Sequence, residues 1–125
     1  MKVSTLFPIN AVVAVVFGLG FIFAPVWLLS LYGVTADAPL AYVGQLLGAA
    51  FLSFAVITWM ARNAPASPVR SAIVLALFVG DAIGFIVSLL AQLKGFANAL
   101  GWSTVAIYLL LALAFGYVQF MAKES

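Results

Sequence analysis

The sequence contains no cysteine and no histidine. Without cysteine the chain has no disulfide and no thiolate, and without histidine it lacks the side chain that titrates nearest to neutral pH. These absences exclude zinc sites of the usual kind, haem ligation by His or Cys, and Cys/His nucleophilic chemistry. The sequence also has no Walker loop, no paired intramembrane acids and no metal-ligand cluster. We therefore predict that the protein is not an enzyme and binds no metal.

Charged residues are also scarce, since they make up 6% of the 125 residues, whereas 67% are hydrophobic and the mean hydropathy is +1.29. This composition lies far outside that of soluble globular domains. About 20 apolar residues span a bilayer, so the chain has room for four spans and short loops. The five basic residues are dispersed, which argues against a nucleic-acid footprint. The sequence predicts one all-α membrane domain over residues 1–125, with the lipid bilayer as its surroundings.

Four apolar segments are predicted to be transmembrane helices, at residues 6–24, 40–61, 68–93 and 100–121. Pro8 is expected in the first turn of the first helix, where its missing N–H costs little. Ser67 is a candidate N-cap for the third helix. Pro25 ends or kinks the first helix, and residues 26–32 keep helical spacing up to Gly33. They are predicted to form a short interfacial helix.

The basic residues indicate the orientation of the spans. Lys2, Arg62, Arg70 and Lys123 fall on one side of the predicted bundle, and Lys94 falls on the other. Cytoplasmic segments carry an excess of Lys and Arg. We therefore predict an antiparallel, up-and-down four-helix bundle in a bacterial inner membrane, with both termini in the cytoplasm.

Aromatic residues occur near the ends of the predicted spans. Trp and Tyr are favoured at the level of the lipid headgroups because their rings are amphipathic. The predicted interface anchors are Trp27, Tyr32, Trp59 and Trp102.

Asp81 is the one acidic residue inside the predicted spans. It lies 11 residues after Arg70, or roughly 16 Å along a helix, which is near the bilayer midplane. A carboxylate at this depth is costly and normally faces protein or a cavity. Two interpretations stay open: a neutral acid that hydrogen-bonds a neighbouring helix, or a contact for the polar group of a lipid-soluble ligand.

Other polar residues are candidate partners of Asp81. Ser53 and Tyr108 are predicted at similar depths on other helices, and the long side chain of Gln45 can reach inward from nearer the outer surface. The tentative ligand site therefore comprises these four residues. Asn10 lies near a membrane end, and we expect it to be solvated or bonded to the backbone.

Small residues recur at four-residue spacing on two of the predicted helices. Gly44 and Gly48 form one set, and Gly80, Gly84 and Ser88 form the other. Such spacing lets helices approach closely. We predict that both sets pack inside the bundle, and the alternative is a dimer face.

The segments "LFPINAVVAVVFGLGFIFAPVWLLSLYGV" and "GQLLGAAFLSFAVITWMAR" resemble the DoxX-like group of small bacterial four-helix membrane proteins. The shared features are a Pro-broken first span ending in Leu-Tyr-Gly, a second span closing on Trp-x-x-Arg, and Gly-Trp opening the fourth. A basic residue often stands in that group where this chain has Gln45. The resemblance implies an accessory membrane protein linked to respiratory or redox complexes, with no defined reaction.

These observations favour a non-catalytic accessory or binding subunit of a membrane complex, held to a partner protein or to further copies of itself. One alternative is a binder of a lipid-soluble ligand, a quinone or a lipid, near Asp81 and Gln45. A second alternative is an oligomeric proton- or cation-coupled transporter, because four helices leave little room for a pore within one chain.

Overall fold

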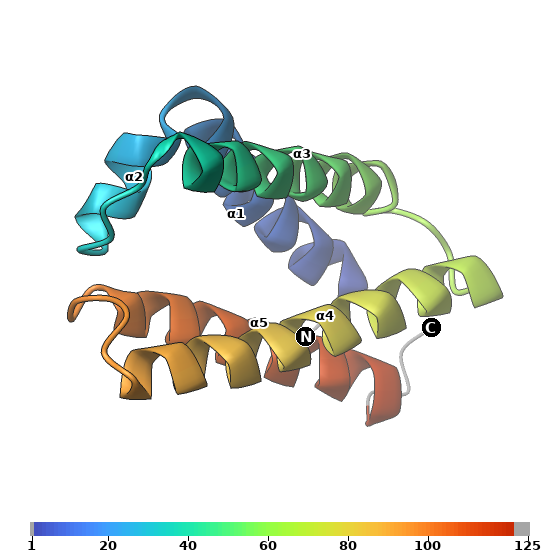
Figure 1. Ribbon diagram of the computed structural model, residues 1–125. Helices are drawn as coiled ribbons and strands as arrows, with labels where there is room; N and C mark the ends of the chain where they lie inside the picture. Colours follow the sequence, from blue (N-terminus) through green and yellow to red (C-terminus); the bar gives the residue numbers. More distant parts are fainter. Residues whose placement is uncertain (1, 122–125) are drawn as a thin grey trace.

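The computed structural model describes residues 2–121, which contain five helices and no strand (Figure 1). Four of the helices are long and apolar enough to cross a membrane, as the sequence predicted. The fifth, α2, is the short helix expected after the first span. In chain order the helices are α1 (Val3–Phe23), α2 (Pro25–Leu31), α3 (Ala38–Met60), α4 (Pro68–Leu93) and α5 (Gly101–Phe120).

Capping side chains determine where two helices begin. Ser67 accepts a hydrogen bond from the Arg70 backbone N–H at 3.1 Å, which confirms the predicted cap of α4. Helix α3 starts two residues earlier than predicted, because Asp37 accepts a bond from the Leu40 N–H at 2.9 Å and Pro39 is tolerated in the first turn.

The position predicted for Pro8 is wrong. Helix α1 begins at Val3, three residues earlier than expected, so Pro8 lies inside the helix and beyond its first turn. Its ring has no N–H to donate to the carbonyl of Ser4, four residues before it. The first turn forms nevertheless, because the N–H groups of Thr5 and Leu6 both donate to the carbonyl of Lys2.

Two glycines with positive φ end helices in the same way. Gly33 and Gly95 both have φ of 77°, a conformation that glycine adopts without a Cβ clash. After α2, the N–H groups of Gly33 and Val34 donate to the carbonyls of Ser30 and Leu29. Gly95 and the residue after it cap α4 in the same pattern. These caps turn the chain sharply at the same end of the molecule.

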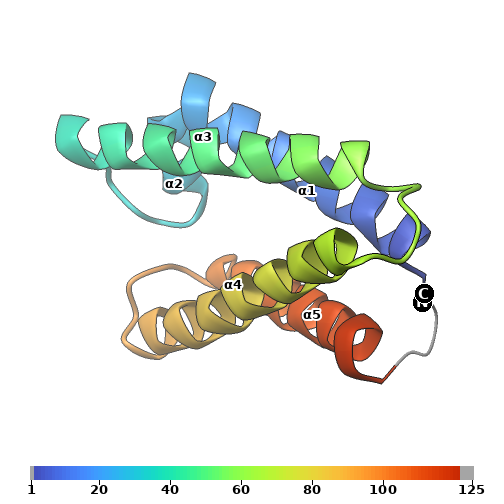
Figure 2. The same ribbon diagram turned by 90° about the vertical axis from the view of Figure 1, so that its right-hand side faces the viewer.

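The helices form two hairpins, α1 with α3 and α4 with α5 (Figures 1 and 2). No Cα atom of α3 comes within 8 Å of a Cα atom in α4 or α5. The long helices of the two hairpins meet near the start of α1 and diverge away from it (Figure 2), and at the other end the last turn of α2 contacts the loop after α4. The bundle is therefore more open than the four-helix packing the sequence predicted.

Small residues build the interface within the first hairpin. Ala11, Ala14 and Gly18 of α1 are buried, as are Gly48 and Ala55 of α3. A Cβ added to Gly48 would lie 2.7 Å from the carbonyl oxygen of Gly18. The two backbones therefore approach as closely as glycine allows, which is how membrane helices gain packing contacts that lipid cannot replace.

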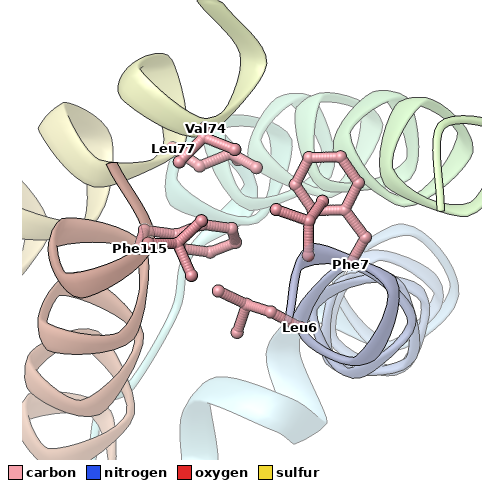
Figure 3. Packing of buried hydrophobic residues seen from close by; sticks show 7 residues of the cluster. Leu6, Phe7, Val74, Leu77 and Phe115 are labelled. Atoms are coloured by element: carbon pink, nitrogen blue, oxygen red, sulfur yellow. The ribbon is translucent and has the colours of Figure 1, made fainter. Parts of the chain in front are cut away.

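Large apolar residues join the two hairpins at one end. Leu6 and Phe7 of α1 point toward Val74 and Leu77 of α4 and toward Phe115 of α5 (Figure 3). Phe7 and Phe115 are fully buried, and their ring centroids are 6.2 Å apart. We call this cluster the apolar plug; its members are Val3, Leu6, Phe7, Val74, Leu77, Phe115 and Val118.

Asn98 joins the hairpins at the opposite end. Its backbone N–H donates to the carbonyl of Tyr32 at 2.8 Å, and its side-chain Nδ2 donates to the carbonyl of Leu31 at 3.0 Å. Its Oδ1 accepts from the N–H of Leu100, just before α5. The end of α2 is therefore tied to the loop between α4 and α5.

Candidate functional site

Asp81 lies on the face of α4 that also carries members of the apolar plug. It follows Leu77 by four residues and Val74 by seven, which places the three on one helical face. The residue is partly exposed, yet its Oδ2 atom is buried and has no hydrogen-bond partner among the described residues. A buried polar atom without a partner is uncommon in native proteins, so Asp81 is the strongest candidate for contact with a molecule other than this chain.

Tyr108 is the sequence-predicted partner that the structure brings to the Asp81 face. Its ring packs on Gly84, one turn from Asp81, so closely that a Cβ added to Gly84 would lie 2.5 Å from the ring. Within the described chain, no hydrogen bond joins Tyr108 to Asp81. Tyr108 therefore forms an aromatic wall beside the carboxyl group.

Asn10 is buried, so the expectation that it is solvated is wrong, and a bond to the backbone stays a prediction. Only 6% of Asn10 is exposed. It follows Phe7 by three residues and Leu6 by four, so it faces the other hairpin directly above the apolar plug. That spacing was visible in the sequence, but the depth of Asn10 was misjudged because α1 begins earlier than predicted.

Asn10 and Asp81 each lie one turn beyond the apolar plug along their own helices, and we call this pair of residues the polar layer. Asn10 lies one turn beyond Phe7, and Asp81 lies one turn beyond Leu77, on helices that both leave the same end (Figure 1). Each step is about 5 Å along its axis.

Ser53 and Gln45 are not brought to this layer. Both are on α3, which stays clear of α4, and both are exposed. The Ser53 hydroxyl donates to the carbonyl of Ala49 on its own helix at 3.4 Å. The structure therefore separates these two residues from Asp81.

Gln45 has a structural partner instead. Its Nε2 donates to the carbonyl of Ile22 at 3.1 Å, across the α1–α3 interface. In a continuous helix the N–H of Val26 would bond to that carbonyl, but Pro25 breaks the helix there. Gln45 thus satisfies a carbonyl that the break exposes.

The small-residue sets have different surroundings. Gly44 and Gly48 pack against Phe21 of α1, and Gly84 packs against Tyr108. Gly80 has no atom within 4 Å of its added Cβ position. The Ser88 hydroxyl donates to the carbonyl of Phe85 on its own helix. Gly80 therefore lies on the exposed side of α4, together with Ala76 and Ile83.

The aromatic residues predicted at the interfaces point outward from the bundle. Trp27, Trp59 and Trp102 are exposed, and Tyr32 is half-buried at the end of α2. The guanidinium of Arg62 lies 4.0 Å from the centre of the Trp59 ring, in a cation–π contact. These positions suit rings that contact lipid headgroups.

The basic residues are distributed between the two ends of the molecule as their sequence positions predict. Arg62 and Arg70 flank the α3–α4 loop at the end where α1 starts and α5 ends, and Lys2 precedes α1 (Figure 2). Lys94 lies at the opposite end, after α4. Lys123 lies outside the described residues. The side of the membrane that each end faces stays a prediction.

Two shallow depressions lie elsewhere on the surface. One is lined by residues of α2 and the loop after it, and the other by Ala11, Ala55 and Trp59 along the outer α1–α3 groove. Neither includes Asp81, Asn10 or Tyr108. They offer few polar groups to orient a ligand, so they are weaker candidates than the polar layer.

Four apolar helices with outward-facing aliphatic side chains fit a small, multi-pass integral membrane protein. Comparison with known proteins found no matching family model, no similar curated protein and no similar solved structure. The resemblance to DoxX-like proteins stays a prediction. Within that membrane class, the polar layer can accept and donate hydrogen bonds.

Proposed function

We propose that this protein is a non-catalytic accessory subunit of a bacterial inner-membrane complex, with the start of α1 and the end of α5 in the cytoplasm. The main observation behind the proposal is that α4 packs against few other helices of the chain. This helix packs along its length against α5 alone, and its contact with α1 is confined to the side chains of the apolar plug. A 26-residue helix that packs along its length against one other helix has a side on which a further helix can pack.

The exposed side of α4 has the composition of a helix-packing surface. Ala72 and Ala76 are exposed on it one turn apart, and Ile83 and Val87 continue the same side. Small residues at four-residue spacing let a second helix approach closely, and flanking aliphatic side chains fill the gaps. These features support a partner with its own transmembrane helix.

Co-purification tests this proposal. The tagged chain is extracted from its native membrane into lipid nanodiscs and weighed by native mass spectrometry. We expect a defined complex, either with a second membrane protein or with further copies of the chain. A lone monomer, with no protein at stoichiometric yield, contradicts the proposal.

Enlarging the exposed α4 surface provides a matched comparison. Ala76→Phe should reduce recovery of the complex at least fivefold, because the added ring prevents close helix approach. Ala106→Phe makes the same change at an exposed position of α5 and should leave recovery unchanged. Equal recovery with both variants would remove α4 from the interface.

A further inference from the structure

We propose that the outer groove between α1 and α3 binds one acyl chain of an anionic phospholipid, while Arg62 at the end of the groove binds the phosphate of that lipid. The proposal stands on a depression in the surface and on a cation held at one end of it. It does not depend on the accessory role, because the groove belongs to α1 and α3, whereas the proposed partner surface lies on α4.

The groove is lined by apolar side chains only. Its lining residues are Ala11, Val12, Val15, Val16, Ala55 and Trp59. Ala11 and Ala55 are buried, whereas Val12 and Val16 are exposed, so the alanines form the bottom of the groove and the valines form one side. An acyl chain can contact such a lining along its length. Since no lining side chain carries a charge, a group at the end of the groove has to select the lipid.

The groove runs from the end of α3 toward the middle of the predicted membrane. Trp59 is the second-to-last residue of α3, and Ala55 lies one turn before it. Helix α1 starts where α3 ends (Figure 2), so Val15, one turn beyond Ala11, lies farther from that end. Each turn advances about 5 Å along the helix. The groove therefore follows the direction of lipid acyl chains, with Trp59 at its headgroup end.

Arg62 places a positive charge at the headgroup end of the groove. Its guanidinium lies 4.0 Å from the centre of the Trp59 ring, and its Nη1 donates to the Trp59 carbonyl at 2.6 Å. These contacts hold the cation beside a residue that lines the groove. A guanidinium has five N–H donors in a planar fork, so the contact with Trp59 leaves donors that can bind two oxygens of one phosphate.

The charges near Arg62 favour an anionic headgroup. Asp37 and Asp81 are the acidic residues of the described chain. Asp37 caps the start of the 23-residue helix α3, roughly 35 Å from its end, and Asp81 lies roughly 16 Å along α4 from Arg70. Neither acid is placed to neutralise Arg62. A lipid with a net negative charge can do so, whereas a zwitterionic lipid brings its own cation close to the guanidinium.

Two lipids with the same acyl chains and different headgroup charge test the proposal. The purified full chain in detergent micelles is titrated with dioleoylphosphatidylglycerol or dioleoylphosphatidylcholine, and binding of the first lipid is followed by native mass spectrometry. We expect the anionic lipid to bind about fivefold more tightly, which corresponds to about 1 kcal/mol, the attraction of one basic residue for anionic lipid. Equal affinity for the two lipids overturns the proposal.

Two arginine variants assign the headgroup preference. Arg62→Gln should bring the affinity ratio of the two lipids close to one. Arg70→Gln removes the same charge at the same end of the molecule, but Arg70 is at the start of α4 and donates to the Ala64 carbonyl. This control should keep a ratio of at least threefold. If both variants lower the ratio equally, net charge explains the preference and the proposal is overturned.

A valine variant tests the acyl-chain part of the site. Val12 is exposed, so the fold should tolerate Val12→Phe, and the added ring should fill the groove. We expect at least threefold weaker binding of both lipids, because the ring displaces the chain and not the headgroup. Val43→Phe makes the same change at an exposed position near the start of α3 and should leave both affinities unchanged. Unchanged lipid binding by folded Val12→Phe would contradict a site in this groove.

Discussion

The substitution of glycine by alanine can be compared at two helical glycines, one in a close helix crossing and one on an open helix surface. Gly48 lies where α3 crosses α1, and a Cβ there would meet the Gly18 carbonyl oxygen at 2.7 Å and Ile22 at 2.9 Å. Gly80 lies on α4 with nothing within 4 Å of its Cβ position. Both are inside helices, so Gly→Ala changes helix propensity equally at the two sites.

The structure gives the expected magnitudes. Alanine in place of glycine inside a helix stabilises it by up to about 1 kcal/mol. Forcing a methyl group into a packed interface costs about 1–3 kcal/mol, and the nearest obstacle to Gly48→Ala is a backbone oxygen that cannot rotate away. We therefore expect Gly48→Ala to destabilise the fold by about 1–2 kcal/mol, and Gly80→Ala to be neutral or to stabilise it.

Reversible unfolding in mixed micelles measures the difference in unfolding free energy between Gly48→Ala and Gly80→Ala. The purified variants are titrated with sodium dodecyl sulfate, and unfolding is followed by tryptophan fluorescence and far-UV circular dichroism. Gly80→Ala controls for propensity and for handling in detergent. If Gly48→Ala proves as stable as Gly80→Ala, the α1–α3 crossing is not the close contact described above.

Three further predictions concern the joints and the orientation. Phe115→Ala should destabilise the fold by about 3 kcal/mol or more, because the buried ring joins both hairpins. Spin labels on introduced cysteines should then report a wider separation of the hairpins. An unchanged distance would show that this ring does not hold the hairpins together. Asn98→Ala should lower the free energy of unfolding by about 1 kcal/mol in the dodecyl sulfate titration, since it removes the side-chain hydrogen bonds between α2 and the loop before α5. Ser103→Ala, which is not part of this joint, is the control. For orientation, Ala36→Cys should react with an impermeant maleimide in intact cells, and Ala64→Cys only after permeabilisation. The reverse pattern would invert the proposed topology.

The helices themselves could be predicted from hydropathy and turn chemistry. Long apolar runs give the four spans, and Ser67 gives the start of α4. Asp37 followed by Pro39 is the sequence signal for the start of α3, because an Asp cap and a first-turn proline both favour a helix N-terminus. Pro8 was misplaced because proline is most favourable in a first turn, whereas α1 accommodates it farther inside.

Helix pairing was harder to predict. Apolar side chains face both protein and lipid in a membrane protein, so periodicity does not distinguish the packed face of a helix from the lipid face. Gly48 and Gly80 both belong to Gly-x-x-x-Gly patterns. A Cβ added to Gly48 would meet the backbone of α1, whereas a Cβ added to Gly80 would meet no described atom within 4 Å. The separation of α3 from α4, which removes Ser53 and Gln45 from the candidate site, has no sequence signal of its own.

The two joints determine how the hairpins are held relative to each other. The first hairpin has a close backbone contact at Gly48, and the second packs aromatic rings on Gly84 and Gly116, whereas the hairpins meet through the apolar plug at one end and Asn98 at the other. Between these joints, apolar groups gain little by leaving lipid for protein, so packing alone does not fix the spacing. Asp81 lies in that middle section, and its buried Oδ2 atom has no hydrogen-bond partner within residues 2–121. The spacing of the hairpins at this level therefore depends on the two joints and not on polar contacts of Asp81 within the described chain.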